Sequence, residues 1–346
     1  MSKQKVLVAK PSGIFGDINY KLEYVRPIYD EKYPDFIDNA LEILQNTYVE
    51  HISPVMKQFI NSVTKGKFEF DLIEEFLKSE KGIISKEQFL HYVEQFNDII
   101  EENHENCKGN LIEKWIQFSL LDDLLTSSTM TDRQKKLISR QKDKMIKQNK
   151  IFLKIIVNED PLVADHEEMF KFLKRYVKFS SKFILKLIDA ESIDKIFCPT
   201  KRNCTVKYLD ETNNCLFRGR LDIQFENIVI EMKNKSYSST DSGTSIFSDL
   251  EIRKEHEFYQ MILYFICILA QQDENQLASP EPYHGMIFNF ADGKLIHVET
   301  KVSRKEAKDE AARCLEKLGH VSRSLYSSDK YTSMIRYLVD LKESKN

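Results

Sequence analysis

Glycine and proline are scarce in this chain, where they account for 10 and 8 of 346 residues. These two residue types dominate tight turns and interrupt helices, so their scarcity predicts long helices joined by few turns. The length is ample for a buried core and allows one large domain or two smaller ones.

The cysteines lack the spacing of a zinc site or of a disulfide framework. They form no CxxC pair and no finger pattern, so we expect no structural zinc. The six positions are 107, 198, 204, 215, 267 and 314. The first ten residues are too charged for a secretory signal. We therefore expect reduced thiols and an intracellular protein, cytoplasmic or nuclear and not secreted.

Long apolar runs, an excess of basic residues and glycine-rich loops are also missing. The longest apolar run, residues 261–270, is too short to cross a bilayer, so we expect no membrane partner. The formal net charge is −3, so any contact with nucleic acid must use a local basic surface. No glycine-rich phosphate loop is present, which excludes an NTPase motor.

The first half of the sequence has helical periodicity. Apolar residues recur at helical spacing in residues 34–62, where Pro54 can kink or split the helix, and again in two further segments. These segments are residues 70–79 and 86–101. Another helix begins near Gly109, and helical sequence continues from 131 to about 190.

These patterns predict two regions. Residues 1–108 form a helical N-terminal accessory region, suited to binding substrate, to a protein partner or to self-association. Residues 109–346 form the second domain, with a helical insertion at about 127–190.

After the insertion the periodicity changes to that of strands. Three strands, a helix and a hairpin are predicted in this order, at residues 204–208, 215–225, 228–233, 249–272, 285–290 and 294–300. The hairpin turns at Asp292-Gly293. Two C-terminal helices follow, the first starting with a capping box of Ser303 and Glu306 and stopping at Gly319. The predicted fold class is α/β, with a mixed sheet flanked by helices.

Two acidic residues and a lysine fall on the second and third strands. Glu231 and Lys233 are two positions apart, so both side chains lie on one face of their strand. Asp222 comes nine positions earlier, across a short turn that can bring the two carboxylates together. Carboxylates and the carbonyl of Met232 suit Mg²⁺ or Mn²⁺, and the lysine can position water or offset negative charge. The set predicts metal-dependent hydrolysis of phosphodiester bonds.

A solvated strand of alternating charges would also explain the Glu-x-Lys triplet. The preceding residues 228–230 are all apolar, however, which indicates a covered strand. Charged groups within a covered sheet are costly unless they serve a function, so we favour the catalytic interpretation.

The order of these motifs resembles the PD-(D/E)XK nuclease superfamily, above all its branch of RecB-type nuclease domains, lambda-type exonucleases and McrC-type restriction subunits. In that branch a G-[RK]-x-D strand, an E-x-K strand and a Q-x-x-x-Y helix follow one another. Residues 219–222, 231–233 and 260–264 match the three motifs. The resemblance covers about residues 109–301 and implies a restriction-endonuclease-like core.

The resemblance also implies roles for single residues. It implies Asp222 and Glu231 as metal ligands and Lys233 as the catalytic lysine. Gln260 and Tyr264 would organise the site or contact the substrate.

The first motif of the family is an upstream helix with a glycine followed by Glu or His. Gly109 and Glu113 fit it, which implies Glu113 as a further metal contact. The long gap between Glu113 and Asp222 requires an inserted helical segment. Otherwise a residue of a later helix takes this place, and the candidates are His166, Glu167 and Glu168.

Some relatives bind an iron–sulfur cluster through one upstream and three clustered downstream cysteines. Only Cys267 and Cys314 lie downstream of the expected site, and they are far apart in the sequence. We therefore expect no iron–sulfur cluster.

Two groups of basic residues are candidates for binding substrate. Arg218 and Arg220 flank the strand of Asp222 and can either grip a phosphate or pair with a core acid. Residues 132–154 hold nine Lys or Arg against two Asp, as a phosphate-contacting helix or as a solvated face. The candidates in that segment are Lys142, Lys144 and Lys147.

The function predicted from these features is metal-dependent hydrolysis of nucleic acid, and of DNA rather than RNA. One alternative is a catalytically silent module of the same fold that binds nucleic acid or protein. Another is a restriction-type endonuclease subunit that needs a partner NTPase.

Overall fold

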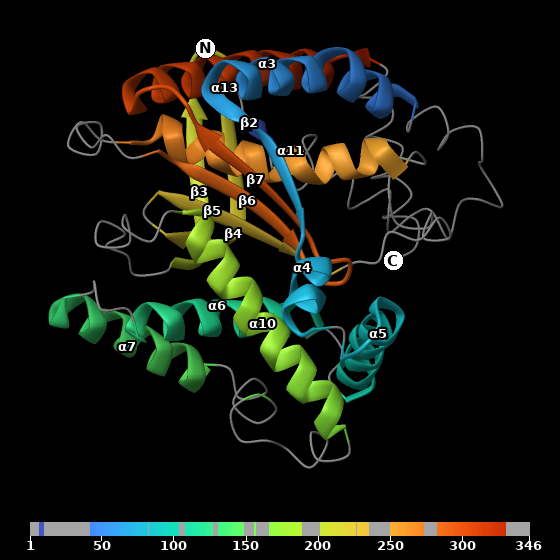
Figure 1. Cartoon of the computed structure of the whole chain (residues 1–346). Helices are drawn as coiled ribbons and strands as arrows, with labels where there is room; N and C mark the ends of the chain where they lie inside the picture. The colour runs from blue at the N-terminus through green and yellow to red at the C-terminus, as the bar shows by residue number, and fades with distance from the viewer. Residues whose placement is uncertain are drawn as a thin grey trace, which may run out of the picture.

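The computed structural model describes eleven parts of the chain. These are residues 7–9, 42–81, 83–103, 108–126, 131–148, 156, 166–188, 201–225, 227–234, 250–272 and 282–329. They form a mixed seven-stranded sheet with helices on both faces, so the predicted α/β class is confirmed (Figure 1). The loop at 236–248 lies outside the described residues, as do Cys107 and Cys198.

The strands follow the order β1-β4-β5-β6-β7-β2, and β3 pairs with β4. Their bounds are Leu7–Ala9 (β1), Thr64–Asp71 (β2), Lys201–Asp210 (β3), Cys215–Phe225 (β4), Ile228–Lys233 (β5), His284–Asn289 (β6) and Lys294–Thr300 (β7). The β1–β4 and β5–β6 pairs are parallel, and the others are antiparallel. A parallel β5–β6 pair requires a crossover, which helix α11 provides.

Helices cover the two faces of the sheet as separate layers (Figure 1). They are α3 (Ser53–Val63), α4 (Leu72–Ser79), α5 (Lys86–Asn103), α6 (Lys108–Thr126), α7 (Asp132–Gln148), α10 (Glu167–Leu187), α11 (Leu250–Ala270) and α13 (Arg304–Ser327). Helices α3, α11 and α13 pack on one face, and α4, α5, α6 and α10 on the other. None of the described helices has the length and hydrophobicity needed to cross a membrane.

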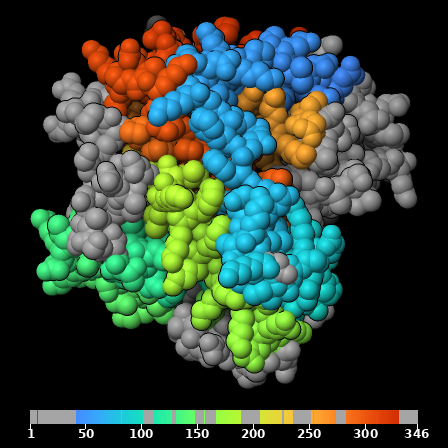
Figure 2. Space-filling view, viewed as in Figure 1, coloured from blue at the N-terminus to red at the C-terminus, as the bar shows by residue number. Residues whose placement is uncertain are grey.

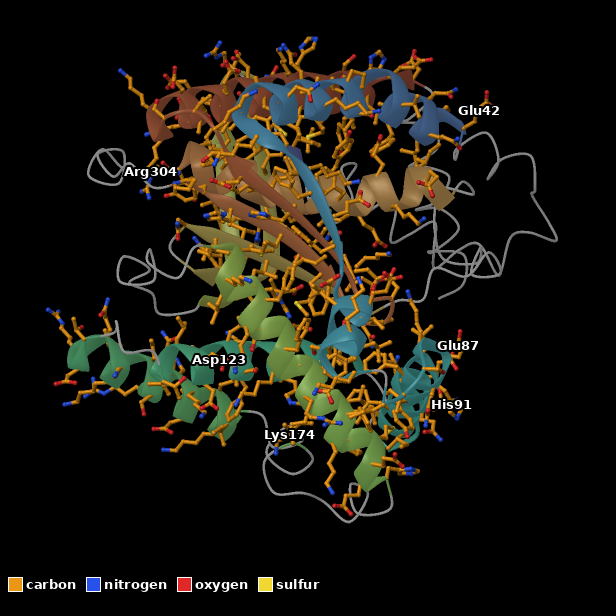
Figure 3. All side chains as sticks on the ribbon, viewed as in Figure 1. Glu42, Glu87, His91, Asp123, Lys174 and Arg304 are labelled. Carbon is orange, nitrogen blue, oxygen red and sulfur yellow. The ribbon has the colours of Figure 1, made fainter. Side chains whose placement is uncertain are left out.

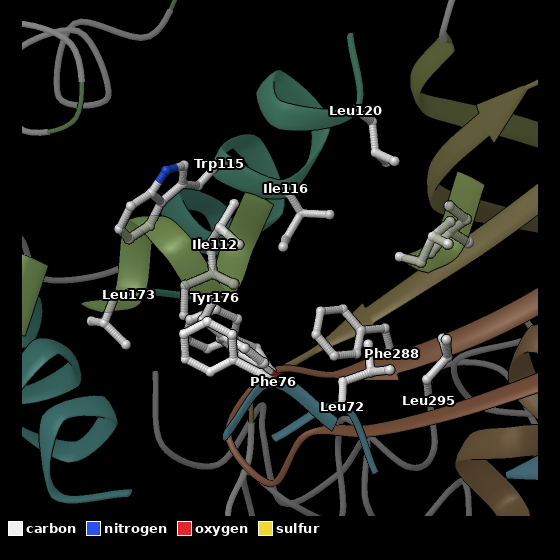
Figure 4. Packing of buried hydrophobic residues seen from close by; sticks show 14 of the residues in the cluster. Leu72, Phe76, Ile112, Trp115, Ile116, Leu120, Leu173, Tyr176, Phe288 and Leu295 are labelled. Carbon is white, nitrogen blue, oxygen red and sulfur yellow. The ribbon is translucent and has the colours of Figure 1, made fainter. Parts of the chain in front are cut away.

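A hydrophobic cluster lies on each side of the sheet. On the α11 side, α11 is buried almost throughout its second half, from Met261 to Ala270. On the other side, Tyr176 of α10 packs between Phe76 and Phe288, and Ile112 and Ile116 bring α6 into the same cluster (Figure 4). Burial on both faces explains why β5 begins with three consecutive apolar residues.

The predicted strands at 215–225 and 228–233 are confirmed, and the helix split near Pro54 is as expected. A π-helical turn (η1, Tyr48–Ile52) precedes α3, and Pro54 stands in the first turn of α3. Proline fits there because the first turn leaves its N–H groups without helical partners.

The predicted helix at 70–79 is present, but its predicted start is two residues too early. Phe70 belongs to β2, which pairs with β7, and α4 begins at Leu72. The Asp71 carboxylate accepts a hydrogen bond from the backbone N–H of Glu74 at 3.0 Å and caps that helix. The N-terminal region is therefore not entirely helical, because it supplies an edge strand of the central sheet.

The prediction that Gly319 ends a helix is also wrong. Helix α13 continues through Gly319 to Ser327. A Cβ atom at this position would collide with the Asp210 carboxylate, which is buried at the end of β3. The glycine therefore allows a close approach of helix and strand. The capping box of Ser303 and Glu306 is confirmed.

Candidate active site

The strands β4 and β5 separate at the predicted site. They pair as a hairpin only from Phe225–Ile228 to Ile223–Ile230. Continued in the same register, the next pair would be Asp222 and Glu231. Instead, the backbone N–H of Met232 donates a hydrogen bond to Oδ2 of Asp222 at 2.8 Å. The carboxylate of Asp222 thus occupies the gap that opens between the strands.

A chain of hydrogen bonds joins β5 to α11. Val229 packs in the cluster on the α11 side, so strand alternation directs Glu231 and Lys233 to the same side. The Nζ atom of Lys233 lies 3.0 Å from Oε1 of Glu231 and donates to Oε1 of Gln260 at 3.2 Å. Nε2 of Gln260 is 3.4 Å from the hydroxyl of Tyr264, one helical turn further on. The five residues predicted as catalytic therefore meet at one place.

The two acids of this site lie beside each other, Glu231 buried and Asp222 half-buried. Burial raises the pKa of Asp222. Burial also raises the pKa of Glu231 to about 7, and the charges of Asp222 and Glu113 act in the same direction, while Lys233 opposes them. Burial lowers the pKa of Lys233, but the charges of Glu231 and Glu257 outweigh it and the pKa is raised. At neutral pH the ammonium is charged, and Glu231 is poised between its two protonation states.

Among the candidates for the upstream acid, Glu113 is the one that is both buried and electrostatically coupled to Glu231. Glu167 and Glu168 are exposed in the first turn of α10, and Glu167 pairs with Lys171 at 2.6 Å. The motif on α6 is therefore close to the strands in space although it is distant in the sequence.

Glu257 is a residue that the sequence reasoning missed. It lies on α11 one turn before Gln260, and its charge acts on Lys233. The spacing of Glu257, Gln260 and Tyr264 at i, i+3 and i+7 places the three on one face of the helix. This periodicity was the signal available in the sequence.

The predicted basic residues fall into two groups. Arg220 is exposed on β4, and its charge favours the ionised form of Asp222; Arg218 is exposed on the same strand. Lys142 on α7 pairs with Asp122 at 2.5 Å and lies over the ring of Phe118. Lys142 therefore has a packing role. The other two candidates on this helix, Lys144 and Lys147, are exposed.

No group of three or more His, Cys, Asp or Glu side chains in the described ranges is arranged to hold a metal ion. The pair of carboxylates nevertheless fits Mg²⁺, which binds through one or two carboxylates and keeps several waters. Oε2 of Glu231 is buried and has no hydrogen-bond partner among the residues that the structure describes. An oxygen in this state is costly unless a cation or a water molecule contacts it.

A cavity of about 1100 Å³ lies beside the site. Ile287 and Asn289 of β6 are part of its lining, and these residues pair with Glu231 and Lys233 of β5. Asn97 of α5 also lines it and accepts a hydrogen bond at 2.7 Å from Asn234, next to Lys233. Much of the lining belongs to α3, β2 and α5, so the N-terminal region borders this cavity.

Comparison with known proteins found no match, whether among family models, curated proteins or solved structures. The assignment of the site therefore depends on the geometry described above.

Proposed function

We propose that this chain is a Mg²⁺-dependent nuclease of the PD-(D/E)XK type, which hydrolyses phosphodiester bonds in nucleic acid, and in DNA rather than RNA. The observation that carries the proposal is the connected set of Asp222, Glu231, Lys233, Gln260 and Tyr264 at the point where β4 and β5 separate. A surface charge ladder does not explain it, because Glu231 is only 4% exposed.

Asp222 and Glu231 would hold the metal ion, with the carbonyl of Met232 and the carboxylate of Glu113 as further contacts. When bound, Mg²⁺ polarises the phosphate and lowers the pKa of a bound water molecule. A bound cation would favour the ionised carboxylate of Glu231, so metal binding would displace the proton that its raised pKa favours.

Lys233 would offset negative charge on the phosphate. Its raised pKa keeps the ammonium protonated, and Glu231 and Gln260 fix its position from two sides. The contact between Gln260 and Tyr264 orients the amide, so both residues of α11 act by holding Lys233. Arg218 and Arg220 are exposed on β4 and can contact a phosphate of the substrate.

The test is cleavage of end-labelled single-stranded, duplex and circular DNA, with and without Mg²⁺. Asp222→Asn and Lys233→Met should each reduce Mg²⁺-dependent cleavage by at least about 100-fold, because each removes a group that acts on the reacting phosphate. Lys305→Met is the matched control. Lys305 is exposed on α13 and does not line the cavity beside the site, so its replacement should leave cleavage unchanged.

Full cleavage by either site variant would refute the proposal. Binding of DNA without cleavage in both Mg²⁺ and Mn²⁺ would indicate a silent module of the same fold. Cleavage that depends on an added NTPase would indicate a restriction-type subunit.

A further inference from the structure

Helix α10 carries a row of cations on its exposed face. They recur every three or four residues, which places them on one side of the helix. This row, the α10 ridge, has six members, all exposed: Lys171, Lys174, Arg175, Lys178, Lys182 and Lys186. The acidic residues of α10, Glu167 and Glu168, are both in its first turn. The chain as a whole has a net charge of −3, so this concentration of positive charge is local.

Most of the ridge is not neutralised by acids. Lys171 pairs with Glu167, and Arg175 pairs with Glu80 at 2.8 Å while it covers the ring of Phe172. The other four have no acidic partner in the part of the chain that the structure describes, and they are Lys174, Lys178, Lys182 and Lys186. A solvated helix face usually carries charges of both signs, whereas after the first turn of α10 the charged residues of this face are all basic.

The ridge is held rigidly. The opposite face of α10 is buried against the sheet and α6, with Tyr176 and Ile184 fully covered. The hydroxyl of Ser181 donates to Oδ2 of Asp123 on α6 at 2.5 Å. Figure 3 shows Asp123 on α6 and Lys174 on α10. Because α6 also carries Glu113, the ridge has a fixed position relative to the candidate active site.

The ridge is long enough to follow a nucleic-acid backbone. From Lys171 to Lys186 the helix rises by about 22 Å, at about 1.5 Å per residue. In Figure 2, α10 reaches the surface in the middle of the face shown. Lysines without neighbouring exposed aromatic rings suit phosphate contacts, which position a nucleic acid without reading its sequence.

We propose that the α10 ridge binds the phosphate backbone of the nucleic-acid substrate, independently of base sequence. This inference rests on the proposed nuclease function and adds a substrate surface on the face of the sheet opposite α11. A membrane surface is the other common anionic partner of basic helices. Such helices insert an apolar face, and the apolar face of α10 is already buried in the core.

The test is the salt dependence of binding, measured in EDTA so that no cleavage occurs. The ridge variant replaces Lys174, Lys178, Lys182 and Lys186 by Gln. If all four contact phosphates, the slope of log K against log salt should become shallower by about 3.6 for duplex DNA and about 2.8 for single strands. A second variant with Arg at the four positions should bind as the unchanged chain does.

A matched control removes four cations from the opposite layer, where α3 and α13 lie. It replaces Lys301, Lys305, Arg313 and Lys317, all exposed, by Gln. The control and the ridge variant have the same change in net charge. A difference between them therefore reports direct contacts of the ridge with DNA, not the general attraction between a positive charge and DNA. The control should change the slope by less than about 1.

A ridge variant with the same slope as the control would overturn the inference. So would loss of binding to anionic phospholipid vesicles without loss of DNA binding. Binding through the ridge by a chain that never cleaves would leave the inference standing and refute the nuclease proposal. Normal cleavage and binding by the ridge variant would refute the inference alone.

Discussion

The carboxylate of Glu231 is buried, and its pKa is raised from 4.5 to about 7. Within the described part of the chain, one of its oxygens has no hydrogen-bond partner. A raised pKa means that the folded state holds this proton more tightly than the unfolded state. The stability it contributes is complete below the unfolded pKa and is lost as the pH rises through 7. In EDTA at pH 8, Glu231→Gln should therefore raise the free energy of unfolding by about 1–2 kcal/mol. This net value already includes the stability lost when Lys233 loses its ion-pair partner.

The same variant should reduce Mg²⁺-dependent cleavage by at least about 100-fold, because an amide is a poor metal ligand. Chemical denaturation at pH 5 and pH 8 checks the stability part, and the advantage of the variant should shrink at pH 5. Glu316→Gln, an exposed position on α13, should change neither quantity. A variant less stable than the parent at pH 8 would show that the ion pair with Lys233 outweighs the cost of burial.

At the scale of elements, Gly319 sets the distance between α13 and the end of β3. The Asp210 carboxylate that faces it accepts hydrogen bonds from the backbone and side-chain nitrogens of Asn213, so it cannot easily turn away. In a free helix, Gly→Ala stabilises by roughly 1 kcal/mol. Here Gly319→Ala should instead destabilise by about 1–3 kcal/mol.

A double-mutant cycle isolates this contact. In an Asp210→Ala background the obstacle is removed, and Gly319→Ala should become neutral or stabilising. Urea denaturation of the four proteins gives the coupling free energy, expected at about 1–3 kcal/mol. Additive effects of the two substitutions would mean that the approach of α13 to β3 does not depend on the glycine.

Elements that carry their own pattern were predictable from the sequence, and elements defined by a distant partner were not. The strands of Asp222 and Glu231 have clear periodicity and matched the structure. Strand β2 is charged and short of apolar residues, and its pairing with β7 across more than 200 residues makes it a strand. Gly319 was misread for the same reason, because its neighbour Asp210 comes from another part of the chain.

The candidate site follows the same rule. Asp222, Glu231, Lys233 and the Gln260–Tyr264 pair belong to motifs with fixed local spacing, and the structure brings them together. Glu257 belongs to none of those motifs, and its closeness to Lys233 depends on how α11 crosses the sheet.

For the whole molecule, the buried pair of His284 and His297 should make stability depend on pH. The rings stack between β6 and β7, with Nδ1 of His284 3.0 Å from Nε2 of His297. Burial lowers the pKa of each from 6.5 to about 4. Such a group stabilises the fold above its unfolded pKa, and this contribution is lost as the pH falls from 6.5 to 4. For each histidine the loss should reach about 2–3 kcal/mol at pH 4.

Replacement of one histidine should flatten this part of the stability profile. Urea denaturation of His297→Gln between pH 4 and 7 should show a smaller decrease in unfolding free energy than in the parent, and His284→Gln should behave in the same way. His51 is exposed, so His51→Gln serves as the control and should keep the parental profile. The comparison uses the shape of the profile, since the glutamine also changes packing and lowers stability at every pH. If the unfolding free energies of the parent and of both histidine variants fall by the same amount between pH 7 and pH 4, the acid sensitivity comes from the carboxylates instead.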